Sequence, residues 1–413
     1  IRPVTAHFAS SSLCHEAHKR ICHSIPENTK SINNACCKRS YAYNICIKIK
    51  KVDAHTAPVQ TNGKITYSIG KPSFIAYSCY QKIFPNEKLL FTNVYEKDMY
   101  CIEKICKTKD MEYTEGFIEN EGVKIFYREY GSMESQPILL VHGLGAQLVH
   151  WPPHLISFLI GHNYRVITFD NRDSGLSSRF KDKPSFGLGY LRYFLKLPIK
   201  TEYSLNDMAK DGINLLDHLQ IKQAHILGTS MGGMITQILC SKYPERVKSF
   251  TLIASTASVP GPLNGASKDV RNMMIERSKL ENPTMEEVYQ REIKWVGLIG
   301  MKDRVVDTPE FRESTISNYK RVEDIKDGFG YARQLLAILS SKNRIRKVRS
   351  IKADTLIIHG KADPVIDVKN SRLMQKLIRN SKLIVIPNMR HLIEEEILDQ
   401  FKDRLINHLT ANS

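Results

Sequence analysis

The sequence predicts an α/β protein in which helices cover both faces of a mostly parallel sheet. From about residue 116 onward, short apolar runs such as "PILLV" and "AHILG" alternate with longer stretches of helical periodicity. Strands that are buried on both faces lack the polar alternation of a half-exposed strand, so continuous apolar runs are typical of a parallel sheet between two helical layers.

The individual elements follow from their periodicity. The stretch "VKIFYREYG" alternates and predicts an edge strand over 123–131. A helix predicted over 203–220 begins with Ser204, a good capping residue, and Asp207 follows at the third helical position. Further strands are predicted at the start of 137–145 and of 164–177, and over 224–228, 247–256, 354–360 and 382–387. Further helices are predicted over 231–243, 368–378 and 394–409.

Residues from about 258 to 348 interrupt this alternation. The segment is rich in Met, Arg and Glu and mostly helical in pattern, and it separates two predicted strands. We therefore predict a helical cap over one end of the sheet. The stretch "FGLGYLRYFLKLPIK" over 186–200 is a second unusual segment. Two interpretations of it stay open: an insertion at the rim of the pocket, and a surface patch that contacts a membrane.

The first 110 residues differ in composition from the rest. They carry 17 Lys and Arg against 8 Asp and Glu, over half of the chain's net charge of +17, and eight of its nine cysteines. No sustained period is evident there. We interpret 1–110 as a basic, Cys-rich extension that is disordered or not native coding sequence, and we predict that 111–413 forms the folded domain, which would begin at Met111.

Composition also excludes several function classes. No apolar run reaches the length of a membrane span, and the start has no apolar core of a signal peptide. The cluster "CHEAHKRICH" lacks paired metal-ligand spacing, and the basic residues form no recognisable nucleic-acid module. We therefore expect a cytoplasmic protein with no metal and no nucleic-acid partner. The oligomeric state stays open.

The stretch "GTSMGG" over 228–233 carries the strongest chemical signal. It lies between a predicted buried strand and a predicted helix, and strand, Gly-x-Ser-x-Gly, helix is the pattern of a nucleophile elbow. Gly228 and Gly232 are expected where a Cβ would collide with neighbouring backbone. The turn would expose the Ser230 hydroxyl at the carboxyl edge of the sheet, in front of a helix N-terminus.

Two later residues can activate Ser230. Asp363 follows the strand predicted over 354–360, and His391 follows the last predicted strand. The order Ser, acid, His is the one that accompanies this elbow. We predict that His391 is the base and that Asp363 orients it. Asp354 and Glu394 are rival carboxylates, but the first precedes its strand and the second lies in the final helix.

An oxyanion requires two hydrogen-bond donors. The N–H of Met231, directly after the nucleophile, is the first candidate, and the N–H of Leu144 in the loop "HGLGA" is the second. His142 is expected to brace this loop. Trp151 is assigned to substrate binding in the acyl pocket, with packing in the core as the alternative. The loop "FDNRDSGLS" is expected to have a structural role.

Together these motifs resemble the α/β-hydrolase superfamily over about 115–410. "DNRDSGLSS", "YSLNDMAKDGINLLDHL" and "GTSMGGMITQ" resemble the group that contains aclacinomycin methylesterase and related small-molecule carboxylesterases. The resemblance implies an eight-stranded sheet, a helical cap, no cofactor and a triad of Ser230, Asp363 and His391.

The expected function is hydrolysis of a small-molecule carboxylic ester through an acyl-enzyme. A carbon–carbon bond hydrolase, a lactonase and a cofactor-free perhydrolase can use the same residues and stay open. A non-catalytic protein that binds a ligand in a hydrolase-like fold is the alternative from another class. Dehalogenases and epoxide hydrolases of this fold need a carboxylate nucleophile, and a serine at position 230 argues against both.

Overall fold

The chain divides into two units, residues 1–104 and 105–413. The computed structural model describes residues 59–61, 64–66, 111–258, 266–279, 283–325 and 329–413. In the first unit, β1 (Val59–Thr61) and β2 (Lys64–Thr66) form an antiparallel pair. Apart from these two strands, residues 1–110 lie outside the described ranges. Our interpretation of them as a disordered or non-native extension therefore stays a prediction.

The second unit contains an eight-stranded sheet in the order β10-β9-β8-β7-β5-β6-β4-β3. The pairs β3–β4 and β4–β6 are antiparallel and the others are parallel. The mostly parallel sheet and the implied eight strands are thereby confirmed. The strands are β3 (Tyr113–Asn120), β4 (Val123–Tyr130), β5 (Gln136–Val141), β6 (Tyr164–Phe169), β7 (Ala224–Thr229), β8 (Val247–Ile253), β9 (Thr355–Gly360) and β10 (Ser381–Ile386).

Strand β3 was not predicted from the sequence, and the prediction of an edge strand over 123–131 is wrong, because β3 lies between β4 and the edge of the sheet. It pairs with β4 through a two-residue turn in which Glu121 and Gly122 have φ values of 51° and 76°. Two consecutive positive φ values match the twist of a β-hairpin. Most side chains of β3 are exposed, with Ile118 buried, so the strand has little of the apolar pattern that would identify it.

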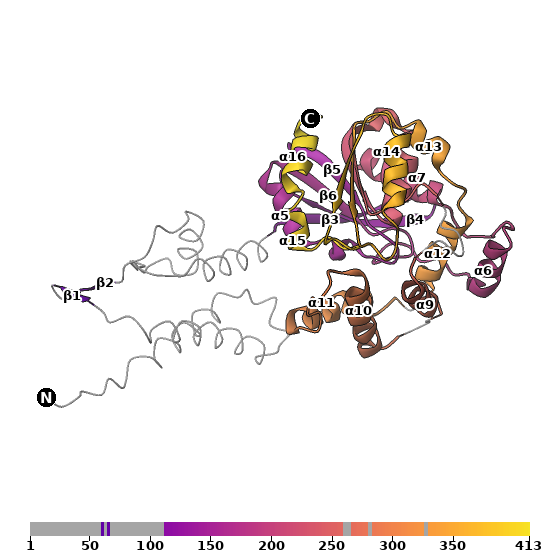
Figure 1. Cartoon of the computed structure of the whole chain (residues 1–413), viewed down its shortest axis with the longest axis horizontal. Helices are drawn as coiled ribbons and strands as arrows, with labels where there is room; N and C mark the ends of the chain where they lie inside the picture. Colours follow the sequence, from indigo (N-terminus) through magenta and orange to yellow (C-terminus); the bar gives the residue numbers. More distant parts are fainter. Residues whose placement is uncertain (1–58, 62–63, 67–110, 259–265, 280–282, 326–328) are drawn as a thin grey trace. The chain divides into compact units, whose positions relative to one another are not determined.

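Helices cover both faces of the sheet (Figure 1). One core cluster packs α7, α8 and α14 against it, and a second packs α5, α15 and α16 against the opposite face. The bounds are α5 (Pro153–Gly161), α7 (Leu205–His218), α8 (Met231–Lys242), α14 (Lys369–Leu377), α15 (Glu395–Leu398) and α16 (Lys402–Thr410), with the short 3₁₀ helices η2 (Leu148–His150) and η3 (Pro244–Arg246).

Further helices lie outside these two layers. The segment between β8 and β9 contains α9 (Lys268–Arg277), α10 (Met285–Ile299), α11 (Pro309–Lys320), α12 (Gly330–Ser340) and α13 (Ile345–Arg349). Figure 1 shows α9 to α12 gathered beyond one end of the sheet, beside α6 (Phe186–Phe194). This is the segment in which the sequence predicts a helical cap.

Helix ends follow local capping chemistry in one case and tertiary packing in another. Ser204 and Asp207 form the predicted reciprocal capping box at the start of α7. The single helix predicted over 394–409 is wrong, because α15 and α16 are separate. Phe401 between them has φ −134° and is 1% exposed, so burial of its ring in the core takes precedence over a continuous helix.

None of the described helices is long and apolar enough to cross a bilayer.

Candidate active site

Ser230 lies at the tip of the turn from β7 to α8. Its backbone has φ 54° and ψ −120°, a conformation that non-glycine residues rarely adopt. The Ser230 N–H donates to the carbonyl of Ile253 at 3.0 Å, and the Ser255 hydroxyl donates to the Ser230 carbonyl at 2.8 Å. Two neighbouring segments therefore hold the strained backbone in place.

The two glycines that bracket Ser230 have the steric role predicted from the sequence. A Cβ on Gly228 would lie 2.7 Å from the carbonyl oxygen of Gly232, and one on Gly232 would lie 2.0 Å from that of Val141. Real Cβ contacts are not this short, and backbone carbonyls cannot move aside as flexible side chains can. The turn can therefore pack against β5 only with glycine at these positions.

Replacing Gly232 with alanine is expected to destabilise the fold by about 1–3 kcal/mol, because the methyl group overpacks against the backbone of β5. Gly297→Ala in α10 is the matched control. A Cβ there meets nothing within 4 Å, and alanine in a helix is favoured over glycine by about 1 kcal/mol. Thermal unfolding followed by circular dichroism measures both. A Gly232→Ala protein as stable as the wild type would contradict the steric argument.

The structure brings Ser230, His391 and Asp363 together. His391 Nε2 is 3.0 Å from Ser230 Oγ, and His391 Nδ1 is 2.7 Å from Asp363 Oδ2. An ionised carboxylate can only accept hydrogen bonds, so Nδ1 carries the proton and Nε2 is free to accept from the serine hydroxyl. The arrangement can move a proton from Ser230 to His391.

Asp363 is held in its ionised form. Burial alone would raise its pKa, but the electrostatic interaction with His391 and hydrogen bonds from His359 and His391 outweigh burial and hold the pKa well below its usual range. The other carboxylate oxygen accepts from the N–H groups of Val365 and Ile366 at 2.8 and 3.0 Å. The carboxylate is thus fixed in orientation as well as in charge.

His359 contacts the same carboxylate, although the sequence analysis did not single it out as a site residue. Its Nε2 lies 3.3 Å from Asp363 Oδ2 and 2.8 Å from the carbonyl oxygen of Ile366, while Nδ1 lies 2.6 Å from Ser371 Oγ. With the proton on Nε2, the imidazole donates toward Oδ2 and accepts from the Ser371 hydroxyl. His359 and His391 therefore both contact the same carboxylate oxygen, Oδ2.

The end of α10 holds the loop that carries His391. The N–H of His391 donates to the carbonyl of Ile299 at 2.9 Å. The N–H of Met301 in turn donates to Glu394 at 2.7 Å. The rival carboxylate Glu394 thus binds backbone of the inserted helical segment, and the other rival, Asp354, directly precedes β9 as predicted.

The two proposed oxyanion donors lie on backbone beside Ser230. Met231 begins α8, and Gly143, next to Leu144, is so close that a Cβ on it would lie 3.2 Å from Ser230 Cβ. Within the described residues, the N–H groups of Leu144 and Met231 have no hydrogen-bond partner. Two unpaired donors beside Ser230 suit a developing negative charge on oxygen.

His142 braces the loop before Leu144, as predicted. Its Nδ1 accepts a hydrogen bond from the N–H of Gly143 at 2.7 Å, and its ring lies 4.5 Å from the ring of Trp151. Burial, together with the proximity of His150, lowers the pKa of His142 to about 3. The ring is therefore neutral near pH 7 and keeps the lone pair that Gly143 needs.

The assignment of Trp151 to substrate binding is not supported. Its side chain is 2% exposed and belongs to the core cluster that packs α5 against the sheet, and it does not line the pocket at Ser230. An indole is large enough to fill the space behind His142, so the packing alternative is the one that the structure favours.

The loop after β6 has the structural role predicted for it. Asp170 accepts from the N–H groups of Leu148 and Leu176 and pairs with Arg321 at 2.7 Å. Arg172 makes two hydrogen bonds to Asp211, at 2.7 and 2.6 Å. These buried contacts pin the loop that lies next to the candidate oxyanion loop.

Two residues of α12 that the sequence did not single out join these loops. Gln334 accepts from the N–H of Gly145 at 2.8 Å and donates to the carbonyl of Arg172 at 2.8 Å. Arg333 makes two hydrogen bonds to Asp173, at 2.8 and 2.9 Å. The inserted helices are thereby fastened directly to the loops around Ser230.

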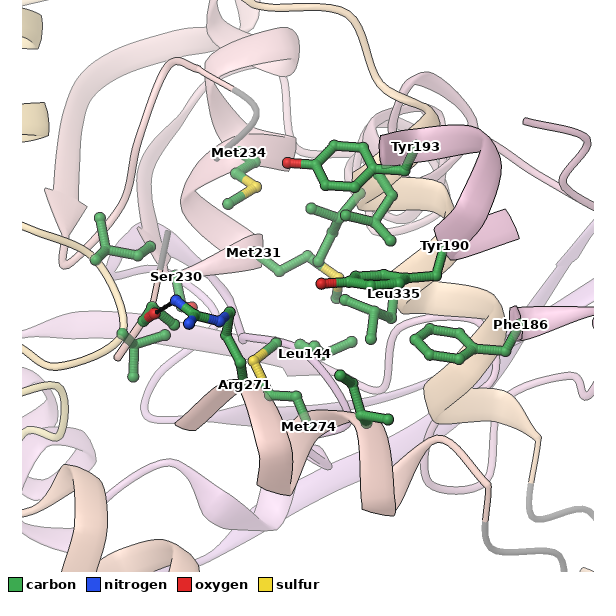
Figure 2. A pocket seen from close by; sticks show the side chains of 16 residues that line it. Leu144, Phe186, Tyr190, Tyr193, Ser230, Met231, Met234, Arg271, Met274 and Leu335 are labelled. Atoms are coloured by element: carbon green, nitrogen blue, oxygen red, sulfur yellow. Dashed lines mark hydrogen bonds between the residues drawn. The ribbon is translucent and has the colours of Figure 1, made fainter. Parts of the chain in front are cut away.

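A largely apolar pocket opens at Ser230 (Figure 2). Its walls come from the candidate oxyanion loop, from α6, α8, α9 and α12, and from the loop after Asp363. Among the described residues that line the pocket, Arg271 alone has a charged side chain, and it donates to the carbonyl of Ala266 at 2.6 Å. Such a pocket favours an apolar ligand.

The sheet order and the serine on a strand–helix turn define a protein of the α/β-hydrolase class. Comparison with known proteins agrees. The chain belongs to the alpha/beta hydrolase fold family, whose profile matches residues 136–396. The fold class implied by the motifs is thus confirmed.

Relatives within the family differ in activity. Rhodomycin D methylesterase of Streptomyces peucetius is 22% identical over 309 residues, which cover 71% of this chain and 97% of that enzyme. Lipase 1 of Psychrobacter immobilis is 25% identical over 292 residues, 68% of this chain and 79% of the lipase. The structure of 2-hydroxy-6-oxo-6-phenylhexa-2,4-dienoate hydrolase from Rhodococcus sp. strain RHA1 has a TM-score of 0.56 at 20% identity, and the match covers 73% of this chain and 100% of that chain. The methylesterase match agrees with the resemblance seen in the motifs.

Proposed function

We propose that the protein is a serine hydrolase that cleaves a carboxylic ester of a small, largely apolar molecule through an acyl-enzyme. The observation that carries the proposal is the pair of contacts from His391, 3.0 Å to Ser230 Oγ and 2.7 Å to Asp363 Oδ2, at an apolar pocket. The similarity to a methylesterase supports ester chemistry.

The proposed reaction begins with attack of Ser230 Oγ on the ester carbonyl carbon. His391 Nε2 takes the hydroxyl proton as the bond forms, and the N–H groups of Leu144 and Met231 stabilise the oxyanion. His391 then gives the proton to the departing alcohol, which leaves the acyl group on Ser230. Water, deprotonated by His391, repeats the sequence and releases the carboxylic acid.

The ionised Asp363 makes this proton transfer favourable. When His391 becomes an imidazolium, the buried carboxylate at 2.7 Å compensates the new charge in a site with little water. It also keeps the ring in the tautomer that presents a lone pair to Ser230. The apolar pocket supplies binding energy to the acyl or alcohol part of the substrate.

Hydrolysis of p-nitrophenyl esters from acetate to decanoate, together with labelling by a fluorophosphonate, tests the proposal. We expect one covalent label per chain, on Ser230, and higher kcat/KM for medium-length acyl chains than for acetate. A folded protein that is neither labelled nor active would contradict a serine hydrolase. Labelling without ester turnover would contradict the ester and favour carbon–carbon bond, lactone or peracid chemistry.

A further inference from the structure

Half of the large exposed hydrophobic side chains of the described residues lie in one short segment. Ten such side chains are exposed in the described part of the chain, and five of them belong to α6 and the turn after it. The five are Leu188 (54% exposed), Leu191 (53%), Phe194 (53%), Leu195 (55%) and Leu197 (47%). We call them the α6 patch. An apolar cluster this dense on a surface marks an interaction site.

The opposite side of the same helix already has a role. Phe186, Tyr190 and Tyr193 line the pocket that contains Ser230, and Figure 2 shows these three rings entering it from one helix, with Met231 and Leu335 across from Tyr190. Helix α6 is thus the wall between the pocket and the α6 patch. Whatever covers the patch is therefore separated from the pocket by this helix.

The patch has a fixed shape. A Cβ on Gly189 would lie 2.4 Å from Leu336 of α12, so the helix packs closely on its neighbour. The Arg192 guanidinium donates to the carbonyl of Pro198, and the N–H of Leu197 donates to the carbonyl of Arg192 at 2.7 Å. These bonds fold the chain after α6 back on the helix and hold the apolar side chains outward.

The surroundings of the patch are basic. Residues 181–200 contain five basic side chains, Lys181, Lys183, Arg192, Lys196 and Lys200, and one acidic side chain, Asp182. The four lysines are exposed. Apolar side chains that insert below the headgroups, with cations at headgroup level, are the combination that binds an anionic lipid surface.

We propose that the α6 patch docks the protein on an anionic lipid bilayer, and that ester substrate passes from the bilayer along α6 into the pocket. A bilayer satisfies the apolar side chains and the lysines at once, and it needs no matching shape. The docking does not depend on the chemistry at Ser230, so it can be tested apart from the proposed function.

Flotation of the full chain with vesicles tests the docking. Wild type is expected to float with vesicles of phosphatidylcholine and phosphatidylglycerol at 7:3, and to float less as salt rises. Leu191→Ser with Phe194→Ser removes apolar side chains without a change of charge, and is expected to lower the partition coefficient at least tenfold. Lys196→Glu with Lys200→Glu should lower it similarly.

Met133→Ser with Val305→Ser is the matched control, because both side chains are exposed, at 64% and 75%, and neither belongs to the patch. Residues 1–110 are identical in every variant, so the difference between the two neutral double variants reports the patch alone. Ser230→Ala should float like wild type even if no ester is ever cleaved.

Equal flotation of the two neutral double variants would overturn the proposal, as would absence of wild-type binding. Sedimentation velocity without lipid tests whether a second copy of the chain binds the patch instead. A wild-type dimer that the Leu191→Ser, Phe194→Ser variant alone dissociates would show that the patch binds a second copy of the chain, and this too would overturn lipid docking.

Discussion

Ser230→Ala is expected to reduce ester hydrolysis by about 10⁴–10⁶-fold in kcat while the protein stays folded. Alanine removes the Oγ that lies 3.0 Å from His391 Nε2, and with it the atom that forms the acyl-enzyme. The turn accepts alanine, because the wild-type residue already carries a Cβ at φ 54°. Steady-state kinetics on the preferred p-nitrophenyl ester, with a thermal unfolding curve, measure both effects.

Ser350→Ala is the control for this loss. Ser350 is exposed, follows α13 and donates only to the carbonyl of Lys347, so its removal should leave kcat and KM unchanged. Residual activity of Ser230→Ala within tenfold of wild type would mean that another residue is the nucleophile.

The strain at Ser230 gives a second, independent readout. Glycine adopts a positive φ without steric cost, so Ser230→Gly should be as inactive as Ser230→Ala but more stable than it by about 1 kcal/mol. This comparison separates the cost of the elbow conformation from the loss of the hydroxyl. A Ser230→Gly protein less stable than the alanine variant would show that the turn stores no such strain.

Much of the candidate site could be read from the sequence because each residue follows a recognisable strand. Ser230 directly follows a strand, Asp363 and His391 come a few residues after one, and the carboxyl ends of parallel strands share one edge of the sheet. The glycines around Ser230 were predictable because a sharp turn between a buried strand and a helix leaves no room for Cβ atoms.

The contacts that support the site were not predictable in the same way. Gln334 reaches Gly145 across 189 residues, and Arg333 reaches Asp173 across 160. Nothing local distinguishes these two residues from other polar residues of an amphipathic helix. Their role depends on where α12 packs, which is a tertiary property. Trp151 was misjudged for the same reason, because a large ring near a loop fits a pocket wall and a core equally well.

Helix boundaries, too, were predictable only where neighbouring residues in the sequence determine them. The start of α7 could be predicted because Ser204 and Asp207 are a local capping pair. The break between α15 and α16 could not, because the intervening residues include no proline or glycine. There the helix is interrupted where the Phe401 ring is buried in the core. Periodicity alone does not show that burial of this ring outweighs continuation of the helix.

Asp363→Asn is expected to lower kcat by about 10⁴-fold with little change in KM. The asparagine carbonyl can still accept from the N–H groups of Val365 and Ile366, so the loop keeps its shape. The amide NH₂ then takes the position of Oδ2 and faces His391 Nδ1 as a donor. The imidazole must move its proton to Nε2, which can then no longer accept from Ser230.

Asp367→Asn is the matched control on the same loop. Asp367 is exposed and accepts from the N–H of Lys369 at 2.8 Å, away from the histidines, so its amide variant should keep wild-type kcat. If Asp363→Asn also keeps wild-type kcat, Asp363 is not the acid that orients His391, and the two rival carboxylates, Asp354 and Glu394, must be replaced next.

The acid dependence of stability gives a third test of the same residue. The pKa of Asp363 is lower in the folded protein than the value of about 4 for an unfolded chain. Ionisation of Asp363 therefore stabilises the fold above pH about 4, and this contribution is lost as the pH falls below that value. Urea unfolding between pH 7 and 3 should show a smaller loss of unfolding free energy for Asp363→Asn than for Asp367→Asn. Identical pH profiles for the two variants would contradict the lowered pKa of Asp363 in the folded protein.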